Sequence, residues 1–395
     1  MEKERKIKNV IIVNDFDYVQ GGASKVALDT AELLKNDYNV IYFSGTNEST
    51  SEDIEFVSTN QKEALKDNKV RGTINGLYNV KAKNSFSKLL DQYSNEDTII
   101  HIHGWTKLLS SSIFVPAFKK KFKVVVTLHD YFTACPNGGF FNYPKNTICD
   151  LKPMSFKCIK CNCDSRNYAF KLYRLIRQDI QNSIIKNNLK YAIGISDLNI
   201  KVLKKLLPGT EIRKIINPIE LELKYSYSKK NDYYLYLGRV TKEKGVDIFC
   251  ETISKMNKKA IVVGDGSELE RLKKEYPNII FTGWKSKEEV DSYLKGAKAL
   301  ILPSLWYEGA PLTPLEAMSY GVPCIISSVC SGREYITDNG FIFNPYKIGD
   351  LEDKINLLEE DIIKYSKNSF EYVKKYDKDN YVKELKKYYN KIIND

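Results

Sequence analysis

The sequence predicts an α/β protein of two domains, each built on a parallel β-sheet. Short apolar runs alternate with helical patterns along nearly the whole chain, as expected where each strand is followed by a helix that packs on the sheet. The chain has 395 residues, which is more than a single hydrophobic core usually holds. Ligands of such folds bind at the carboxyl ends of the strands, so residues there are the first candidates for a site.

The expected elements follow one another in a regular order. In the first half, strands are expected at residues 9–13, 40–43, 98–101, 124–128 and 192–195, with a helix over about 24–34. The second half repeats the scheme with strands at residues 233–237, 261–263, 279–281, 300–302 and 324–327. Asn217-Pro218 ends one unit, and a polar stretch precedes the next strand. We therefore expect two Rossmann-like domains facing each other across a cleft, residues 1–216 and 217–372, and an amphipathic helix within residues 373–395.

Composition excludes some classes of protein and leaves others open. No apolar run approaches the length of a membrane span, and the charged N-terminus lacks the apolar stretch of a signal peptide, so we expect a cytoplasmic protein. The formal charge of +11 is compatible with nucleic acid, anionic lipid or a phosphorylated substrate. Lys, Asn, Ile and Tyr are all abundant, as AT-rich codon usage would produce, so the total charge does not select among these partners.

The segment at residues 308–316 places two carboxylates around a small-residue turn that opens into a helix. An apolar strand ends at Pro303, and Thr313, Pro314 and Glu316 have the spacing of a helix N-cap, first turn and capping box. The N-terminus of a helix is a natural site for an anion, and the carboxylates of Glu308 and Glu316 can accept hydrogen bonds from sugar hydroxyls. The structural alternative for Glu316 is that it only caps its own helix.

Two basic residues and a second glycine turn indicate a phosphate site in the same half. Arg239 and Lys244 lie just past the strand at 233–237, where a planar guanidinium and a compact ammonium could share a pyrophosphate. Gly264-Asp265-Gly266 follows the strand at 261–263 and would let the backbone approach a nucleotide. Each feature alone is weak, but all of them lie at the carboxyl ends of strands in one domain. Together they favour a nucleotide diphosphate as ligand.

These motifs resemble those of the retaining family 4 glycosyltransferases, which have the GT-B fold. The resemblance rests on Gly238-Arg239 with Lys244, the Gly264 turn, Pro303-Ser304 and the segment 308–316, and it extends over most of the chain. It implies a nucleotide-activated sugar as donor, with Arg239 and Lys244 on its diphosphate, Glu316 on the ribose and Glu308 on a hydroxyl of the transferred sugar. Backbone amides of the turn would hold the distal phosphate, here Gly309, Ala310, Leu312 and Thr313. Pro311 departs from the usual Gly-Phe-Gly pattern and supplies no amide.

In the first domain the resemblance rests on two loops. Gly21-Gly22 lies where relatives bring backbone near the donor phosphate or the acceptor, although the same glycines could simply form a turn. His129 matches the histidine that faces the donor sugar across the cleft in relatives, and His101, His103 and Trp105 are expected on the acceptor side. No third ligand accompanies His101 and His103, so zinc is not expected there. In relatives the C-terminal helix crosses back to the first domain.

The chemistry expected of the site requires no metal ion. Arg239, Lys244 and a helix N-terminus can stabilise the departing diphosphate, and the resemblance implies retention, with the leaving phosphate accepting the proton of the incoming hydroxyl. Asp15-Phe16-Asp17 resembles a metal-binding DxD motif but lies in the first loop of the other domain, so we expect a solvated or acceptor-side loop. Two carboxylates could also indicate a glycoside hydrolase, but the basic pair and the glycine turns have no role in one.

Five of the eight cysteines fall in one segment, which we expect to be an insertion at residues 135–163. A cytoplasmic chain is not expected to keep them as disulfides. Two interpretations remain open: a structural zinc ion drawn from these thiols, or a surface insertion with reduced thiols. The zinc ion, if present, would be structural and not catalytic. The thiols concerned are Cys135, Cys149, Cys158, Cys161 and Cys163.

Basic clusters in the first domain bear on the acceptor. Residues 113–118 are largely apolar and precede four lysines at 119–123, as in a segment that touches anionic lipid. Lys171, Arg174 and Arg177 follow at three-residue steps on one face of an expected helix. Each cluster could also be an ordinary solvated face. Both fit a polyprenyl-diphosphate-linked acceptor and peripheral contact with the inner membrane surface.

We therefore expect a retaining hexosyltransferase that acts on a glycan or lipid-linked oligosaccharide in the synthesis of capsule, exopolysaccharide or lipopolysaccharide. One alternative is a nucleotide-sugar epimerase of similar fold, which would need no acceptor. The other is a basic nucleic-acid-binding protein, which would explain the charge of +11 but would leave the two carboxylates without a role. No nucleic-acid partner is expected.

Overall fold

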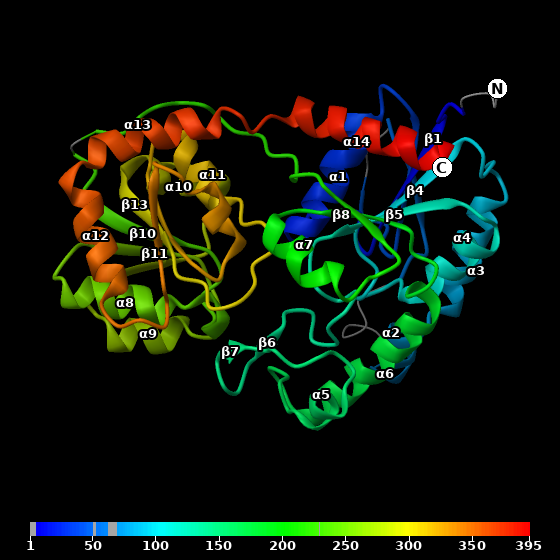
Figure 1. Ribbon diagram of the computed structural model, residues 1–395, viewed down its shortest axis with the longest axis horizontal. Helices are drawn as coiled ribbons and strands as arrows, with labels where there is room; N and C mark the ends of the chain where they lie inside the picture. The colour runs from blue at the N-terminus through cyan, green and yellow to red at the C-terminus, as the bar shows by residue number, and fades with distance from the viewer. Residues whose placement is uncertain (1–4, 50–52, 62–68, 229) are drawn as a thin grey trace.

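The computed structural model describes residues 5–49, 53–61, 69–228 and 230–395. A separate parallel sheet forms the centre of each half of the chain (Figure 1). The strand order is β3-β2-β1-β4-β5-β8-β9 in the first sheet and β12-β11-β10-β13-β14-β15 in the second. In both sheets the order reverses beside the first strand of the unit, β1 or β10, and such switch points are where open α/β sheets bind ligands. The predicted fold class, two parallel α/β sheets, is confirmed.

The strands of the first sheet are short and mostly buried. Consecutive residues of β1 alternate between two hydrophobic clusters, with Ile11 and Val13 in one and Val10 and Ile12 in the other. Both faces of the sheet are therefore covered, which explains why the strand is a continuous apolar run. The strands are β1 (Asn9–Asn14), β2 (Asn39–Ser44), β3 (Glu55–Ser58), β4 (Thr98–Ile102), β5 (Lys123–Leu128), β8 (Tyr191–Gly194) and β9 (Glu211–Lys214).

Helices connect these strands, and several begin at a residue suited to capping. The side chains of Asn79, Asn167 and Ser196 each accept a hydrogen bond from the backbone N–H three residues on, which satisfies one of the free amides at the helix start. The helices of this half are α1 (Gly22–Leu34), α2 (Lys69–Leu77), α3 (Val80–Leu90), α4 (Phe114–Lys119), α5 (Phe156–Lys160), α6 (Tyr168–Ile185) and α7 (Asp197–Lys204), with a 3-10 turn η1 (Ser111–Ile113).

The second sheet repeats the alternation of strand and helix. Its strands are β10 (Tyr233–Leu237), β11 (Ala260–Val263), β12 (Ile280–Gly283), β13 (Ala297–Leu302), β14 (Cys324–Ser327) and β15 (Gly340–Phe343). Its helices are α8 (Val246–Lys255), α9 (Leu269–Glu275), α10 (Lys287–Gly296), α11 (Thr313–Ser319), α12 (Asp350–Glu360) and α13 (Ile362–Val373), with the 3-10 turns η2 (Lys242–Lys244) and η3 (Ser331–Tyr335). Helix α10 starts with a complete capping box formed by Ser286 and Glu289.

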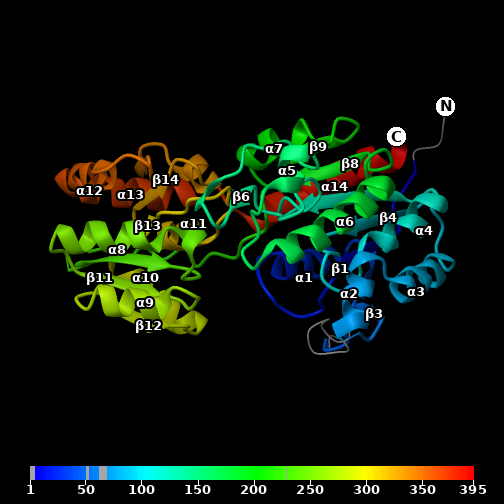
Figure 2. The ribbon, with the colours of Figure 1, turned by 90° about the horizontal axis from the view of Figure 1, so that it is seen from below.

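The last helix, α14 (Lys378–Asn394), lies over the first sheet and not the second (Figures 1 and 2). Tyr381, Tyr388, Tyr389 and Ile392 belong to the same buried cluster as residues of β1. The tail therefore ties the end of the chain to its beginning through apolar packing. The domain limits at residues 216 and 372 stay a prediction. Among the described residues, no helix combines the length and the apolar character that crossing a bilayer requires.

Five short strands were not predicted from the sequence. β3 and β9 are edge strands of four residues with polar members, so neither has the buried run or strict alternation that marks a strand. β15 begins at Gly340, where an added Cβ would lie 2.1 Å from the backbone oxygen of Cys324. That glycine permits close approach of two strands, although glycine usually weakens a strand prediction. The hairpin of β6 (Phe141–Asn142) and β7 (Thr147–Ile148) lies within the cysteine-rich insertion.

Candidate active site

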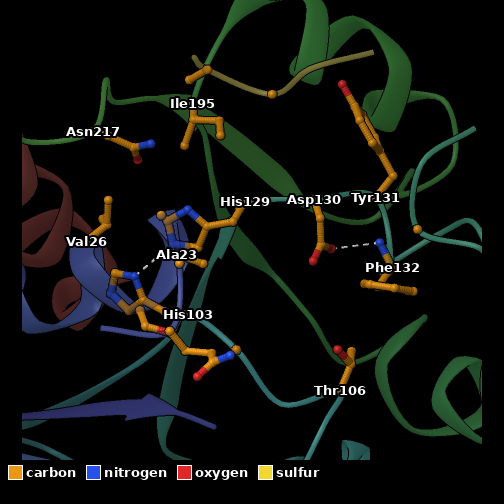
Figure 3. Close-up of a pocket in the computed structure, with 18 of the residues that line it drawn as sticks. Ala23, Val26, His103, Thr106, His129, Asp130, Tyr131, Phe132, Ile195 and Asn217 are labelled. Carbon is orange, nitrogen blue, oxygen red and sulfur yellow. Dashed lines mark hydrogen bonds between the residues drawn. The ribbon is translucent and has the colours of Figure 1, made fainter. Parts of the chain in front are cut away.

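A cavity of about 470 Å³ lies between the two sheets and takes its walls from both. Its position follows from the fold, because the loops after β1, β4 and β5 meet the loops after β10 and β13 there. The size is that of a typical small-molecule site. Figure 3 shows the wall formed by the first half. Of the predicted site residues, those that line it are Gly21, Gly22, His103, His129, Arg239, Glu308, Gly309, Ala310 and Leu312.

Glu308 is the centre of a buried polar cluster at this cavity. The ammonium of Lys244 forms an ion pair with Glu308 Oε1, and the hydroxyl of Ser304 donates to Glu308 Oε2 at 2.6 Å. Only 14% of the Glu308 side chain and 12% of the Lys244 side chain are exposed. Burial disfavours the carboxylate, but Lys244 and Ser304 outweigh burial and hold the pKa of Glu308 below its ordinary value. The carboxylate therefore stays ionised at neutral pH.

Local backbone geometry explains why Lys244 reaches Glu308. Gly245 has a φ of +67°, and a Cβ on it would lie 2.1 Å from the backbone oxygen of Pro303. Only glycine therefore lets η2, which carries Lys244, lie against the loop after β13. The backbone N–H of Leu305 donates to the oxygen of Glu243 at 2.9 Å and fixes that contact.

Arg239 is more exposed and less tightly paired than Lys244. Its side chain is 63% exposed and lines the cavity, with a single weak ion pair to Glu243 at 3.6 Å. The guanidinium is therefore available to an anionic ligand, whereas Lys244 is already held by a carboxylate.

The glycine turn at 264–266 has a structural role that the sequence analysis did not foresee. A Cβ on Gly264 would lie 1.9 Å from the backbone oxygen of Gly238, and one on Gly266 would lie 2.3 Å from that of Val240. The N–H of Val240 also donates to the oxygen of Asp265 at 2.9 Å. The glycines therefore let two loops pack together.

Several predicted residues of this half do not line the cavity: Gly238, Lys244, Gly264, Asp265, Gly266, Thr313 and Glu316.

The predicted capping box at Thr313 and Glu316 is wrong. Leu312 is the N-cap of α11, and no side chain caps this helix. The reason is that the helix starts one residue earlier than the sequence suggested, so the N–H of Glu316 already bonds to the oxygen of Leu312 at 3.0 Å. Glu316 is partly buried, and this burial raises the pKa of its carboxyl. Its side chain is therefore not used for capping.

The three histidines form a continuous column in the first domain. His103 Nδ1 lies 2.9 Å from His129 Nε2 (Figure 3), and the rings of His101 and His103 are 4.1 Å apart. Burial lowers the pKa of His101 and of His129 to about 3 and that of His103 well below its ordinary value. All three imidazoles are therefore neutral at physiological pH. His103 Nε2 is buried without a hydrogen-bond partner among the described residues.

Two of the predicted acceptor-side residues do not reach this cavity. His101 is fully buried, with Nδ1 2.6 Å from the hydroxyl of Tyr389 on α14 and Nε2 2.7 Å from the hydroxyl of Thr127. Trp105 is also buried, and its indole N–H donates to Gln181 at 2.9 Å. Packing against α14 and α6 therefore uses these side chains, and only His103 of the three lies on the cavity wall.

Gly21 and Gly22 sit at the start of α1 on the cavity wall. A Cβ on either residue would meet nothing within 4 Å, and neither has the positive backbone angle that requires glycine. No side chain caps α1. The tight-turn explanation is therefore weak here, and the open space leaves the first amides of the helix accessible to an anion.

The two domains approach closely at the cavity. A Cβ on Gly309 would lie 3.1 Å from the backbone oxygen of His129, and the rings of Tyr131 and Tyr307 are 6.2 Å apart. The carboxylate of Glu334 also accepts from the N–H groups of Asp197 and Leu198, at 2.9 and 2.8 Å, at the start of α7. A small residue at 309 is thus needed for the walls to meet.

Several residues of the cavity wall were not predicted from the sequence, among them Asp130, Asn217 and Trp306. Asp130 accepts a hydrogen bond from the N–H of Phe132 at 2.9 Å (Figure 3). Enclosure by the cavity walls raises the pKa of Asp130 to about 6, while its side chain keeps contact with solvent. Its place directly after His129, at the end of β5, could have indicated it. The indole N–H of Trp306 is buried and has no partner among the described residues.

Of the two expectations for the loop of Asp15 and Asp17, the solvated loop is wrong, because both carboxylates are buried, and the acceptor-side loop stays a prediction. Asp15 accepts from the backbone N–H groups of Lys107, Leu108 and Leu109 at 2.8–3.0 Å. Asp17 accepts from two backbone N–H groups at 2.7 and 3.0 Å and from a threonine hydroxyl. These carboxylates fix the loops beside the cavity, and their oxygens are already occupied.

The cysteine-rich segment surrounds a buried lysine. Lys171 Nζ lies 3.3 Å from Cys163 Sγ and 3.6 Å from Cys158 Sγ, and no carboxylate of the described chain pairs with it. Burial raises the pKa of Cys163 to about 11 and also raises that of Cys149. Within the described ranges, no group of three or more His, Cys, Asp or Glu side chains is arranged to hold a metal ion. Structural zinc stays a prediction, which metal analysis of the purified protein can test.

The arrangement of two sheets around a cavity is shared with known proteins. Two facing parallel sheets with a cavity between them define the GT-B fold, and sucrose-phosphate synthase from Thermosynechococcus elongatus shares it, with a TM-score of 0.73, 17% identity, and coverage of 98% of this chain and 99% of that one. Residues 221–376 match the family model of glycosyl transferases group 1. The second half of the chain is therefore similar to this family, and the resemblance of its motifs to glycosyltransferases is confirmed at that level.

Two characterised relatives have narrower names. The chain is 29% identical over 195 residues to a UDP-Gal:alpha-D-GlcNAc-diphosphoundecaprenol alpha-1,3-galactosyltransferase of Escherichia coli, a match that covers 44% of this chain and 49% of the relative. It is also 29% identical over 194 residues to a lipopolysaccharide 1,6-galactosyltransferase of Salmonella typhimurium, over 44% and 54% of the two chains. The chain thus spans about half the length of the curated relatives it matches.

Proposed function

We propose that this protein is a retaining, metal-independent family 4 glycosyltransferase. It would move a hexose from a nucleoside-diphosphate sugar to a glycan or polyprenyl-diphosphate-linked acceptor in surface-polysaccharide synthesis, at the cytoplasmic face of the membrane. The observation that carries the proposal is the ionised Glu308, held by Lys244 and Ser304, in the cavity that His129 lines from the other sheet. UDP-galactose is the first donor to test, because one relative is named for it.

Each side chain has a proposed role in this reaction. Arg239, exposed in the cavity, would bind the diphosphate and stabilise its charge as it leaves. Lys244 would share the diphosphate while keeping Glu308 ionised, and Glu308 would accept a hydrogen bond from a hydroxyl of the sugar. The open amides at Gly21 and Gly22 would bind the same diphosphate from the other domain.

The remaining roles concern the acceptor and the ribose. The neutral His129 would face the sugar, and His103, whose Nδ1 lies 2.9 Å from His129 Nε2, would orient the His129 ring as a positioning residue. Glu316 would bind the ribose, since its carboxylate is not used to cap helix α11. The leaving phosphate would take the proton of the incoming acceptor hydroxyl on the same face of the sugar, so that configuration is retained. Positive charge from Arg239 and Lys244 makes a divalent ion unnecessary in this scheme.

Donor turnover tests the proposal. Purified protein is incubated with UDP-, GDP- and ADP-sugars, with and without a lipid-diphosphate-linked acceptor, and release of the nucleotide is measured. We expect one donor to be consumed only with acceptor, undiminished by a chelator, and the product to keep the anomeric configuration by NMR. Glu308→Gln should lower turnover by about 10²-fold or more, while the control Glu289→Gln at the exposed start of α10 should not. A changed sugar released without acceptor would indicate an epimerase and contradict the proposal.

A further inference from the structure

Helix α6 presents the opposite face from the one its sequence suggested. Its basic residues point inward: Lys171 is fully buried against two thiols, Arg174 pairs with the buried Asp164 at 3.2 Å, and Arg177 lies 4.7 Å from the ring of Phe132. The basic cluster is therefore used inside the domain. The other predicted lipid-facing segment is buried as well, because Ile113, Phe114, Pro116 and Ala117 pack in the core.

The outward face of α6 is apolar instead. Tyr168, Leu172 and Ile176 follow at four-residue steps, which places them on one side of the helix, and they are 37%, 42% and 54% exposed. The neighbouring helix α5 adds Phe156 and Ile159, which are 69% and 38% exposed. The hydroxyl of Tyr168 donates to the backbone oxygen of Ile159 at 2.9 Å and joins the two helices. We call these five side chains the apolar ridge.

Exposed cations outnumber exposed carboxylates around the apolar ridge. Lys152, Lys157, Lys160 and Arg166 are all exposed, and the ammonium of Lys160 lies 4.3 Å from the ring centre of Phe156. The only carboxylate between residues 151 and 178, Asp164, has a fully buried side chain, while Asp150 and Asp179 at the two ends of the segment are exposed. Apolar side chains flanked by an excess of cations are the features that bind a protein to the surface of an anionic bilayer.

We propose that the apolar ridge inserts into the surface of an anionic phospholipid bilayer and docks the first domain there. This rests on the proposed function in one respect, since a lipid-linked acceptor gives the docking its purpose. Scattered apolar residues on a protein surface need no explanation, but a continuous set on two joined helices does. In Figure 1, α5 and α6 lie along one edge of the first domain, away from α14, so this edge can approach a flat surface.

The ridge is also connected to the cavity. On the inner side of α6, Gln181 donates to the backbone oxygen of Phe132 at 2.7 Å, and Phe132 lines the cavity. A helix with its side chains is about 10 Å across, so docking through the outer face of α6 brings the cavity wall within about that distance of the lipid headgroups. An acceptor sugar attached to a lipid diphosphate could then enter the cavity without leaving the bilayer.

Vesicle sedimentation tests the docking. The full-length protein is mixed with vesicles of phosphatidylcholine alone or of phosphatidylcholine with phosphatidylglycerol, and bound protein is measured. We expect binding to the anionic vesicles, a loss of about tenfold or more in the variant Phe156→Ser/Leu172→Ser/Ile176→Ser, and a loss of the anionic preference in Lys157→Gln/Lys160→Gln/Arg166→Gln. The matched control Trp284→Ser/Ile348→Ser removes apolar residues that are 78% and 98% exposed on the second domain and should bind normally.

Three results would overturn the docking proposal: no binding of the wild type, equal binding of the ridge variant, or a ridge variant that only changes oligomeric state, which would make the ridge a protein interface. Circular dichroism and a thermal melt show whether each variant is folded. Transfer to detergent-solubilised acceptor should survive in the ridge variant, while transfer to acceptor in vesicles should fall about tenfold. Vesicle binding without any donor turnover in the wild type would instead contradict the proposed function and leave the docking intact.

Discussion

The two walls of the cavity differ in how they handle charge. The wall from the second domain carries full charges, with Glu308 and Lys244 buried as a pair and Arg239 exposed beside them. The wall from the first domain carries two histidines, His103 and His129, that burial keeps neutral. Full charges therefore lie where a diphosphate is expected, whereas the opposite wall presents two uncharged imidazoles and also includes the ionisable Lys107 and Asp130. Two similar α/β units can therefore contribute different chemistry to one site, with a charged pair on one wall and uncharged imidazoles on the other.

The largest expected effect comes from removing a charge on the electrostatic wall. Lys244→Met leaves Glu308 as a buried carboxylate without its ammonium, which should lower the free energy of unfolding by about 3–5 kcal/mol and turnover by about 10²- to 10³-fold. Lys244 holds the pKa of Glu308 below its ordinary value, so the pair stabilises the fold above that ordinary value and less as pH falls. In the variant, burial favours the neutral acid, and the loss of stability should shrink towards low pH. Urea denaturation at several pH values measures this.

A double variant separates stability from catalysis. Lys244→Met/Glu308→Gln removes both charges, so most of the stability should return while turnover stays low. Lys285→Met is a matched control, since its pair with Glu289 is more exposed and should contribute little to stability. If Lys244→Met were as stable as the wild type, or if the double variant were fully active, the electrostatic wall would not work as described.

The sequence predicted the electrostatic wall better than the neutral one. Arg239, Lys244 and Glu308 follow strands that are apolar runs, so counting from the strand end was enough to place them at one edge of the sheet. The pairing of Lys244 with Glu308, however, requires the close approach of Gly245 to Pro303. That contact joins segments far apart in the chain, and no local pattern encodes it.

The neutral wall depended on tertiary packing to a greater extent. His101 lies on β4 and His103 directly follows the end of that strand. The two looked equivalent in the sequence, yet α14 covers His101 and leaves His103 at the cavity. The basic face of α6 was predicted to be exposed but is buried for a similar reason. Buried thiols and Asp164 pair with its cations inside the domain. A row of charged residues marks the exposed face of a helix only if no buried group pairs with those charges. A single sequence does not show whether such a buried group exists.

A smaller effect is expected on the neutral wall. His103→Ala removes the partner of His129 Nε2, 2.9 Å away, so the His129 ring loses the hydrogen bond that orients it. We expect kcat to fall about tenfold, since one buried hydrogen bond contributes roughly 1–1.5 kcal/mol, while the Kd for the donor changes little. Steady-state kinetics and calorimetry with the donor measure the two quantities separately.

Thr127→Val is the matched control for His103→Ala. It breaks an equally buried hydrogen bond to the neighbouring His101 but does not alter the wall of the main cavity. It should lower stability and leave kcat near the wild-type value. Should both variants lower kcat alike, the effect would be structural, and the assignment of His103 as a positioning residue would fail.

The smallest effect concerns pH and the one group on the neutral wall that titrates near neutrality. Asp130, whose pKa is raised to about 6, is neutral below that pH and negative above it, so its ionisation should repel the donor diphosphate. We expect the Kd for UDP-galactose to rise about two- to threefold from about pH 5 to about pH 7, and to stay flat in Asp130→Asn. His129, with a pKa of about 3, and Glu308, with a lowered pKa, keep their charge states over this range. A pH dependence that persists in Asp130→Asn would therefore place a second titrating group in the cavity and break the division between a charged and a neutral wall.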